Sequence, residues 1–317
     1  MTAGEVRAAG EYAAYGECRL CPRDCGVNRL AGERGVCGET SECAVAAAEP
    51  HFGEEPCLSG GRGSGTIFFR GCSCGCFFCQ NYQISRGGVG VEIGPEELYS
   101  RAVGLMARGV HNLNFVTGDH FWPHLAALAR RLRAEGATIP LLLNTSGYVR
   151  PERVAEYARW MDIFLPDYKY ADPELAQECM GDARYPELAL AALREMVAAK
   201  GFLFPFDPSG AEPAREGVLV RHLVLPGHIE NTQRALHRLR EAFGPRLPLS
   251  VMSQYRPVAA CRGRGPFERR LTREEHTSVL DLIKALEFEQ VFVQGFEPDD
   301  AFLPDFERRR PFRGNRP

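Results

Sequence analysis

Residues 71–81 read Gly71-Cys72-Ser73-Cys74-Gly75-Cys76-Phe77-Phe78-Cys79-Gln80-Asn81. Cys72, Cys76 and Cys79 have the spacing C-x3-C-x2-C, and three thiolates on one short loop can each bind one iron of a cubane [4Fe–4S] cluster. A complete protein cage for such a cluster supplies four cysteines. The loop therefore leaves one iron for a group other than protein, and an open coordination position is typical of catalytic rather than structural metal centres.

A zinc site, a disulfide pair and chance are the alternatives for these cysteines. Zinc ligands usually come as two pairs, which a three-cysteine loop does not provide. Cys74 lies inside the motif but breaks its spacing, and we interpret it as a bystander.

A short apolar segment, Thr66–Gly71, precedes the loop. Its glycine flanks and its β-branched and aromatic residues predict a buried strand, so the loop follows the carboxyl end of that strand. The stretch from Gly65 to Ser85 resembles the radical S-adenosylmethionine (SAM) enzymes, whose motif is C-x3-C-x-aromatic-C. Within that superfamily it is similar to an uncharacterised group related to pyruvate formate-lyase activating enzymes.

The resemblance implies that Cys72, Cys76 and Cys79 hold a [4Fe–4S] cluster. The fourth iron would bind the amino and carboxylate groups of SAM, with Phe78 near the adenine. The reduced cluster would cleave SAM to methionine and a 5′-deoxyadenosyl radical, which abstracts hydrogen from a substrate. Flavodoxin or ferredoxin is implied as the reductant.

The composition limits the class of protein. At 317 residues and 44% apolar residues, the chain can form one sizeable domain with an appendage. A net charge of −3 gives no reason to expect nucleic acid as a partner, and we expect neither a membrane span nor a secretory signal. Ten of the twelve cysteines lie in the first 79 residues, a pattern that favours metal binding in a reducing cytoplasm.

A second group of cysteines precedes the loop, with the spacing C-x2-C-x3-C-x11-C, and it comprises Cys18, Cys21, Cys25 and Cys37. Four thiolates make a closed site, which suits either zinc or a second iron–sulfur cluster. The residues leave both metals open, together with the alternative of idle buried thiols. Cys43 and Cys57 are interpreted as small buried hydrophobic residues.

Strand and helix patterns alternate after residue 95, which predicts βαβ units and a parallel sheet. We therefore expect an α/β fold, a partial (β/α)6 barrel of radical SAM type with a small cysteine-rich N-terminal extension. The expected domains are residues 1–60, 61–296 and a tail at 297–317. Strands are predicted at Thr66–Gly71, Asn112–Thr117, Ile139–Asn144, Asp162–Tyr168, Val218–Leu225, Leu249–Met252 and Gln290–Gln294. Helices are predicted at Pro95–Arg108, Trp122–Glu135, Pro151–Trp160, Pro173–Lys200 with a break near Gly181 and Pro186, Glu230–Phe243 and Thr272–Phe288.

Polar residues follow each predicted strand, at the end of a barrel where chemistry collects. By resemblance, Gly118 and Asp119 stand where relatives carry a Gly-Gly-Glu turn that receives the SAM amino group. Asn144 and Ser146 would meet the ribose hydroxyls, and His222 lies in a segment similar to the fifth strand of activating enzymes. These five residues are the remaining cofactor-binding candidates.

Asp167-Tyr168-Lys169 matches an Asp-x-Lys that activating enzymes carry on the fourth strand, so Asp167 and Lys169 are the catalytic candidates. The chain has only three lysines against 35 arginines. A lysine at this position therefore indicates a need for a compact ammonium group rather than a planar guanidinium.

The substrate stays open at this level. One alternative is a partner protein, a glycyl radical enzyme that would be activated by hydrogen abstraction from a glycine. Another is a peptide or small molecule that is modified by the radical. A third is a non-catalytic iron–sulfur or zinc scaffold, against which Asp167, Lys169 and the polar strand ends argue.

Overall fold

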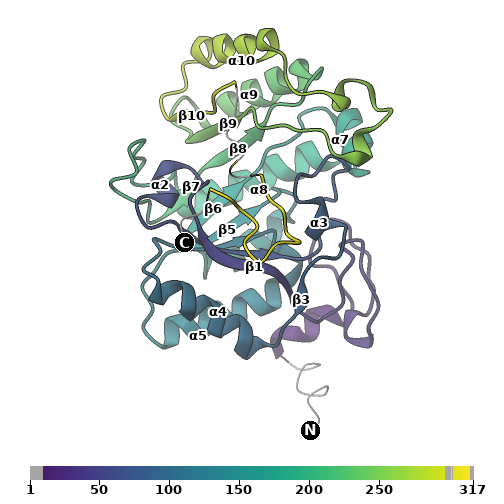
Figure 1. The fold of residues 1–317 in the computed structure, drawn as a ribbon, viewed down its shortest axis with the longest axis vertical. Coiled ribbons are helices and arrows are strands. Elements are labelled where there is room, and N and C mark those ends of the chain that lie inside the picture. The colour runs from purple at the N-terminus through teal and green to yellow at the C-terminus, as the bar shows by residue number, and fades with distance from the viewer. Residues whose placement is uncertain (1–9, 297–300, 302, 315–317) are drawn as a thin grey trace.

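The computed structural model describes residues 10–296, 301 and 303–314, and its strands form two sheets (Figure 1). The larger sheet has the order β3-β1-β2-β4-β5-β6-β7, and the smaller has the order β10-β9-β8. Their bounds are β1 Ala44–His51, β2 Ser64–Phe69, β3 Val91–Glu92, β4 Leu113–Val116, β5 Leu141–Thr145, β6 Ile163–Pro166, β7 Gly217–Val218, β8 Val220–Leu223, β9 Leu249–Met252 and β10 Val291–Val293.

Strands β2, β4, β5, β6 and β7 pair in parallel, as do β8, β9 and β10. A parallel bridge between Asp167 and Arg221 joins the end of β6 to β8, so the two sheets continue as one curved wall. The prediction of a partial α/β barrel is confirmed. The predicted strand 218–225 is divided, because the chain passes at Leu219 from pairing with β6 to pairing with β9.

Strand β1 has no counterpart in the sequence-based prediction, which assigned residues 1–60 to an N-terminal extension. It pairs antiparallel with β2 along most of its length and carries β3 on its other edge. The barrel sheet therefore begins before residue 60, at Ala44, and the cysteine-rich module is confined to the residues that precede β1.

Helices cover the outer face of the sheets, and local sequence sets their ends. Asp172 accepts hydrogen bonds from the first turn of α7, and Thr272 forms a capping box with Glu275 at the start of α10. In the described part of the chain no helix combines the length and apolar character of a membrane span. The helices are α2 Pro56–Ser59, α3 Tyr82–Ser85, α4 Pro95–Ala107, α5 Trp122–Ala134, α6 Val154–Ala158, α7 Pro173–Met180, α8 Tyr185–Lys200, α9 Ile229–Phe243 and α10 Arg273–Ala285, with short 3-10 turns between them.

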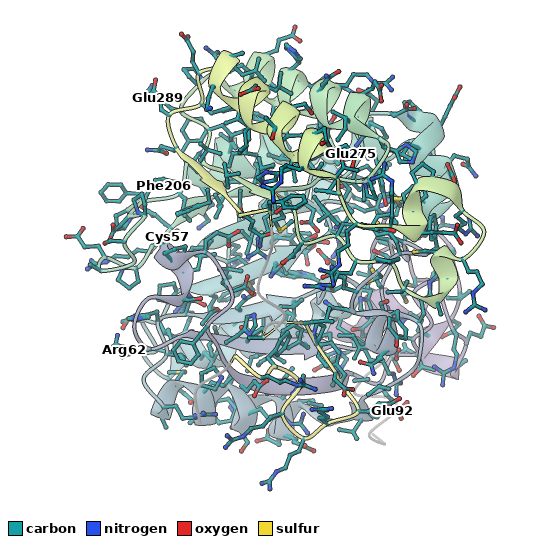
Figure 2. All side chains as sticks on the ribbon, turned by 45° about the horizontal axis from the view of Figure 1, so that its top comes forward. Cys57, Arg62, Glu92, Phe206, Glu275 and Glu289 are labelled. Atoms are coloured by element: carbon teal, nitrogen blue, oxygen red, sulfur yellow. The ribbon has the colours of Figure 1, made fainter. Side chains whose placement is uncertain are left out.

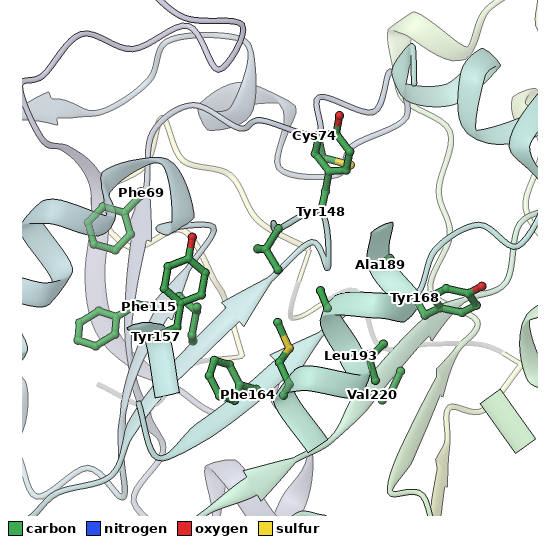
Figure 3. Packing of buried hydrophobic residues seen from close by; sticks show 14 of the residues in the cluster. Phe69, Cys74, Phe115, Tyr148, Tyr157, Phe164, Tyr168, Ala189, Leu193 and Val220 are labelled. Atoms are coloured by element: carbon green, nitrogen blue, oxygen red, sulfur yellow. The ribbon is translucent and has the colours of Figure 1, made fainter. Parts of the chain in front are cut away.

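The main core lies between the sheet and these helices. Figure 3 shows Ala189 and Leu193 of α8 facing the strands that carry Phe164 and Val220, and all four side chains are buried. A smaller core packs beside α2, where Phe206 lies against a group that includes the buried Cys57 (Figure 2). This packing holds the helices against the outer face of the sheets.

The described residues of the C-terminal segment lie across β1 and β2. Phe306 and Phe312 are buried against Phe68, and Gln83 accepts a hydrogen bond from the Phe306 N–H at 2.8 Å. The rest of the predicted tail, residues 297–300, 302 and 315–317, lies outside the described residues.

Gly147 lies between the ends of β5 and β6, and its φ of 72° is in the left-handed region. We predict that Gly147→Ala destabilises the protein more than Gly136→Ala, whose φ is 83°. Both variants lose about 1 kcal/mol from the backbone conformation, but a Cβ at 147 would also overlap the Asp167 carbonyl oxygen, whereas a Cβ at 136 meets nothing within 4 Å. Urea unfolding midpoints measure the difference. Equal losses would show that the ends of β5 and β6 are not tightly opposed.

Candidate active site

A cavity of about 490 Å³ opens at the carboxyl ends of the parallel strands. Three loop cysteines and polar groups from five further strand ends line it together. They are Cys72, Cys76, Cys79, Thr117, Asn144, Thr145, Ser146, Asp167, Lys169, Arg221 and Gln254. The shared edge follows from the parallel pairing, since the carboxyl ends of parallel strands meet on one side of a sheet.

The donor set of the loop fits an iron–sulfur cluster. Cys76 is buried, Cys72 and Cys79 are half-buried, and all three thiols line the same cavity. Burial raises the pKa of Cys72 to about 12 and also raises the pKa of Cys79. Such thiols ionise when a bound metal supplies the positive charge, as coordination of thiolates requires.

In the described ranges no three His, Cys, Asp or Glu side chains are grouped compactly enough for a single metal ion. A cubane makes a different demand, because each cysteine binds its own iron atom.

Cys74 and Cys76 have different surroundings. The Cys76 sulfur accepts a hydrogen bond from the Tyr170 hydroxyl at 3.0 Å and lies 3.6 Å from the Cys74 sulfur. The Cys74 thiol lowers the pKa of Cys76, with further lowering by Lys169 and Tyr170, although burial opposes them. The pKa of Cys74 is raised by the same pair interaction and by burial, and its sulfur lies 3.4 Å from Met180. These contacts favour the thiolate form at Cys76 over that at Cys74.

We predict that Cys74→Ala keeps the iron of the loop, whereas Cys76→Ala loses it. The two cysteines are neighbours in the same buried setting, so the pair of variants separates ligation from packing. Iron and sulfide analysis of anaerobically purified protein measures the outcome. Loss of iron in Cys74→Ala would make Cys74 a ligand and contradict our interpretation of it as a bystander.

Asp167 and Lys169 follow β6 and form an ion pair inside the cavity, with each side chain 19% exposed. Burial acts to lower the pKa of Lys169, but Asp167, Cys76 and Cys74 raise it above its usual value. The ammonium group is therefore held charged next to the loop sulfurs.

The Tyr185 hydroxyl fixes the backbone that carries this pair. It accepts a hydrogen bond from the Lys169 N–H at 2.9 Å and lies 2.9 Å from the Ser146 carbonyl and 3.0 Å from the Asp167 carbonyl. Asn231 of α9 adds a hydrogen bond to the Lys169 carbonyl at 3.1 Å. The ends of β5 and β6 are thereby held in one arrangement.

Several other candidates also face the cavity. Phe78 lines it and stacks on Phe267, with ring centroids 5.9 Å apart. Asn144 and Ser146 line it from the end of β5. Thr117 also contributes, and its φ of 54° shows that the turn after β4 keeps a conformation that glycine usually adopts.

Three of the predicted cofactor-binding residues do not line the cavity. A Cβ at Gly118 would meet Leu125 and Phe69, so this residue faces the core. Asp119 is buried behind the residues that line the cavity. Burial raises the pKa of Asp119 to about 6, although a hydrogen bond with Thr145 acts to lower it. Its Oδ1 has no hydrogen-bond partner among the residues that the structure describes.

His222 differs most from its expected role. Its Nδ1 lies 2.6 Å from the Tyr168 carbonyl and its Nε2 lies 3.0 Å from the Thr232 hydroxyl, and the ring is fully buried. Burial lowers the pKa of His222 to about 4, so the ring stays neutral. Both nitrogens are thus occupied in tying β6 to α9, which corrects the expectation of a cofactor-binding histidine.

Sequence reasoning missed a buried ion group on the cavity wall. Arg221 of β8 contacts both Glu54 and Glu55, and its Nε donates to Glu55 at 2.9 Å. Asn114 donates a further hydrogen bond to Glu54 at 2.9 Å. In the sequence, two adjacent glutamates give only a weak signal for such an ion group. Only the fold brings them next to Arg221, which lies far along the chain.

We predict that Arg221→Met destabilises the protein by about 3–5 kcal/mol, because it leaves two carboxylates buried without a counter-charge. The side chains concerned are 12% and 7% exposed. Arg19→Met is the control, since Arg19 pairs with Glu17 in a solvent-exposed position and should unfold like the parent. Chemical denaturation of both variants tests this, and equal stabilities would contradict the role of the Arg221 group.

Residues 66–204 match the family model of the radical SAM superfamily. These residues therefore carry a radical SAM domain. The matched residues include the cysteine loop, the ends of β4, β5 and β6 and the Asp167–Lys169 pair, but neither the N-terminal cysteines nor Arg221.

Among solved radical SAM structures, a methyltransferase from Sphaerobacter thermophilus has a similar fold, with a TM-score of 0.51 at 16% identity over 72% of this chain and 65% of that protein. Streptococcus suis SuiB bound to S-adenosylmethionine aligns with a TM-score of 0.49 at 12% identity, over 71% of this chain and 48% of SuiB. The chain thus spans about half to two thirds of the length of these proteins. An uncharacterised protein of Methanocaldococcus jannaschii is 27% identical over 285 residues, which cover 88% of this chain and 77% of that protein.

Proposed function

We propose that this protein cleaves SAM reductively and uses the resulting radical to abstract hydrogen from a substrate. The supporting observation is the convergence of three loop cysteines and a charged lysine on one cavity within the radical SAM domain. Cys72, Cys76 and Cys79 would hold a [4Fe–4S] cluster. When bound, this cluster supplies one electron to the sulfonium of SAM, which yields methionine and a 5′-deoxyadenosyl radical.

The chain's own groups would bind and orient SAM. Asn144 and Ser146 offer hydrogen-bonding side chains, and Phe78 offers an aromatic surface for the adenine. The glycine-like turn at Thr117 leaves backbone groups at the cavity wall for the SAM amino group, a task that we had expected of Asp119. The Lys169 ammonium, held charged by Asp167, stabilises negative charge at the loop sulfurs and on a carboxylate bound beside them.

The C-terminal segment covers part of the cavity. Pro304 and Phe312 of the C-terminal segment line it, and Phe78, Tyr255 and Phe292 contribute aromatic surface. Exclusion of solvent protects a reactive primary radical from side reactions. The segment therefore belongs to the proposed active site although it lies outside the matched domain.

For the substrate we favour a glycyl radical enzyme, in line with the Asp-x-Lys that resembles activating enzymes. A cavity of about 490 Å³ that also holds SAM admits a single residue or a small group, not a folded domain. Modification of a peptide or a small molecule is the second candidate, and the same limited space favours it. Flavodoxin or ferredoxin would supply electrons in a reducing cytoplasm, where the twelve free thiols would persist.

The proposal is tested by incubating anaerobically purified, reconstituted protein with dithionite and SAM. We expect 5′-deoxyadenosine and methionine in equal amounts. A protein that binds iron at the loop but forms no 5′-deoxyadenosine with several reductants would contradict the proposal and favour the scaffold alternative.

A variant pair tests the role of Lys169. We expect Lys169→Met to lower 5′-deoxyadenosine formation at least tenfold, which corresponds to about 1.4 kcal/mol of transition-state stabilisation, with unchanged iron content. Lys284→Met is the control, because Lys284 is an exposed lysine on α10 and should leave the rate unchanged. Normal activity of Lys169→Met would remove this residue from the proposed mechanism.

A further inference from the structure

The N-terminal module brings its four cysteines near one another, apart from the barrel cavity. Cys18, Cys21 and Cys37 are buried and Cys25 is half-buried. A Cβ at Gly35 would lie 3.3 Å from the Cys25 sulfur and 3.4 Å from the Cys37 sulfur, so a side chain here would fill the space beside them. The Cys25 thiol also lies 3.8 Å from the Cys18 carbonyl oxygen, which joins the two ends of the C-x2-C-x3-C segment.

Arg29 is a second and independent observation that points to bound metal. Its side chain is fully buried, and among the described residues no carboxylate forms an ion pair with it. The guanidinium donates to the Thr40 and His120 carbonyls, and its Nη1 lies 3.7 Å from the Cys18 sulfur. It also lies over the Tyr15 ring, 4.4 Å from the centroid.

A buried cation without a counter-charge is costly. Neutral thiols would leave Arg29 uncompensated, whereas metal-bound thiolates supply the missing negative charge next to it. The surroundings of Arg29 therefore favour a metal-loaded module over four idle thiols.

The module is in direct contact with the loop that carries the other three cysteines. The Cys72 N–H donates a hydrogen bond to the Cys37 carbonyl at 3.2 Å. A Cβ at Gly71 would overlap that carbonyl at 2.7 Å, so the two backbones touch here. A continuous path of covalent bonds and one hydrogen bond thus links the Cys37 sulfur to the Cys72 sulfur.

We infer that Cys18, Cys21, Cys25 and Cys37 hold a second [4Fe–4S] cluster, which passes electrons to the cluster on Cys72, Cys76 and Cys79. Four thiolates complete this cluster, so it binds no substrate and only changes oxidation state. One electron from a flavodoxin or ferredoxin reduces the second cluster from the 2+ to the 1+ level. The same electron then moves through the Cys37–Cys72 contact, so the second cluster returns to 2+ as the loop cluster becomes 1+.

Zinc is the competing metal for four thiolates. The position of Arg29 favours a redox-active cluster, because a hydrogen bond from a cation to a ligand sulfur stabilises the extra negative charge of the reduced state. The backbone contact with Cys72 can serve electron transfer if the module holds a redox-active cluster, but it has no such use if the module holds zinc. The electron acceptor in this inference rests on the proposed function, but the metal identity does not.

Metal analysis tests the inference without SAM or activity. In a variant that combines Cys72→Ala, Cys76→Ala and Cys79→Ala, we expect about four iron and four sulfide per chain. One zinc and no iron, or no metal in a folded protein, would overturn the inference. If this variant does not fold, Cys25→Ser in the otherwise intact chain should lower the iron content by half, whereas Cys43→Ala, a buried cysteine of the same segment, should not lower it.

Electron paramagnetic resonance tests the contact between the clusters. In the fully reduced protein, spin–spin interaction should broaden the spectrum beyond the sum of the spectra of the triple variant and of Cys25→Ser. A spectrum equal to that sum would overturn the electron path. Cleavage of SAM by Cys25→Ser with dithionite as reductant separates the two proposals. This cleavage should persist, because only the second cluster is lost. If the parent protein does not cleave SAM, that result counts against the proposed function alone.

Discussion

Parallel pairing of β2, β4, β5 and β6 is the constraint on which the site depends. The register aligns Phe68 with Val116, Val116 with Asn144, and Asn144 with Leu165, so the four strands end at one edge. The loop that follows β2 must then face the residues that follow the other three strands. A cysteine loop and a lysine almost a hundred residues further on meet for this reason, without any local signal that links them.

Buried charge is the second feature that organises the molecule. Lys169 is held by Asp167, Arg221 is held by Glu54 and Glu55, and Arg29 lies against cysteine sulfur. Each cation is largely buried, so each depends on a specific partner. In the first two groups the partner is a carboxylate, whereas for Arg29 it would be a metal-bound thiolate.

The C-terminal segment and strand β1 extend this arrangement beyond the radical SAM domain. Both lie outside residues 66–204, yet Phe312 of the segment and His51 of β1 line the same cavity as the loop cysteines. The proposed active site is therefore assembled from the N-terminal, central and C-terminal parts of the chain. Substitutions outside the matched domain can therefore affect the proposed active site directly.

The sequence by itself determined the cysteine motif, the alternation of strands and helices, and the polar residues that follow the strands. These features can be predicted from the sequence because they depend on residues that are close together in the chain. The motif depends on the spacing within one loop, and each helix or strand depends on the periodicity of its own side chains. Leu249–Met252 was predicted with its observed bounds, and the break near Gly181 separates α7 from α8 as expected.

Only the tertiary structure decided which strand-end residues enter the cavity. It turned His222 toward Tyr168 and Thr232, set Gly118 against the core and brought Glu54 and Glu55 to Arg221. It also added β1 to the barrel sheet and placed Cys37 against Cys72. The physical reason is that side-chain direction at a strand end and pairing between distant segments depend on packing across the whole fold, which local sequence patterns do not encode.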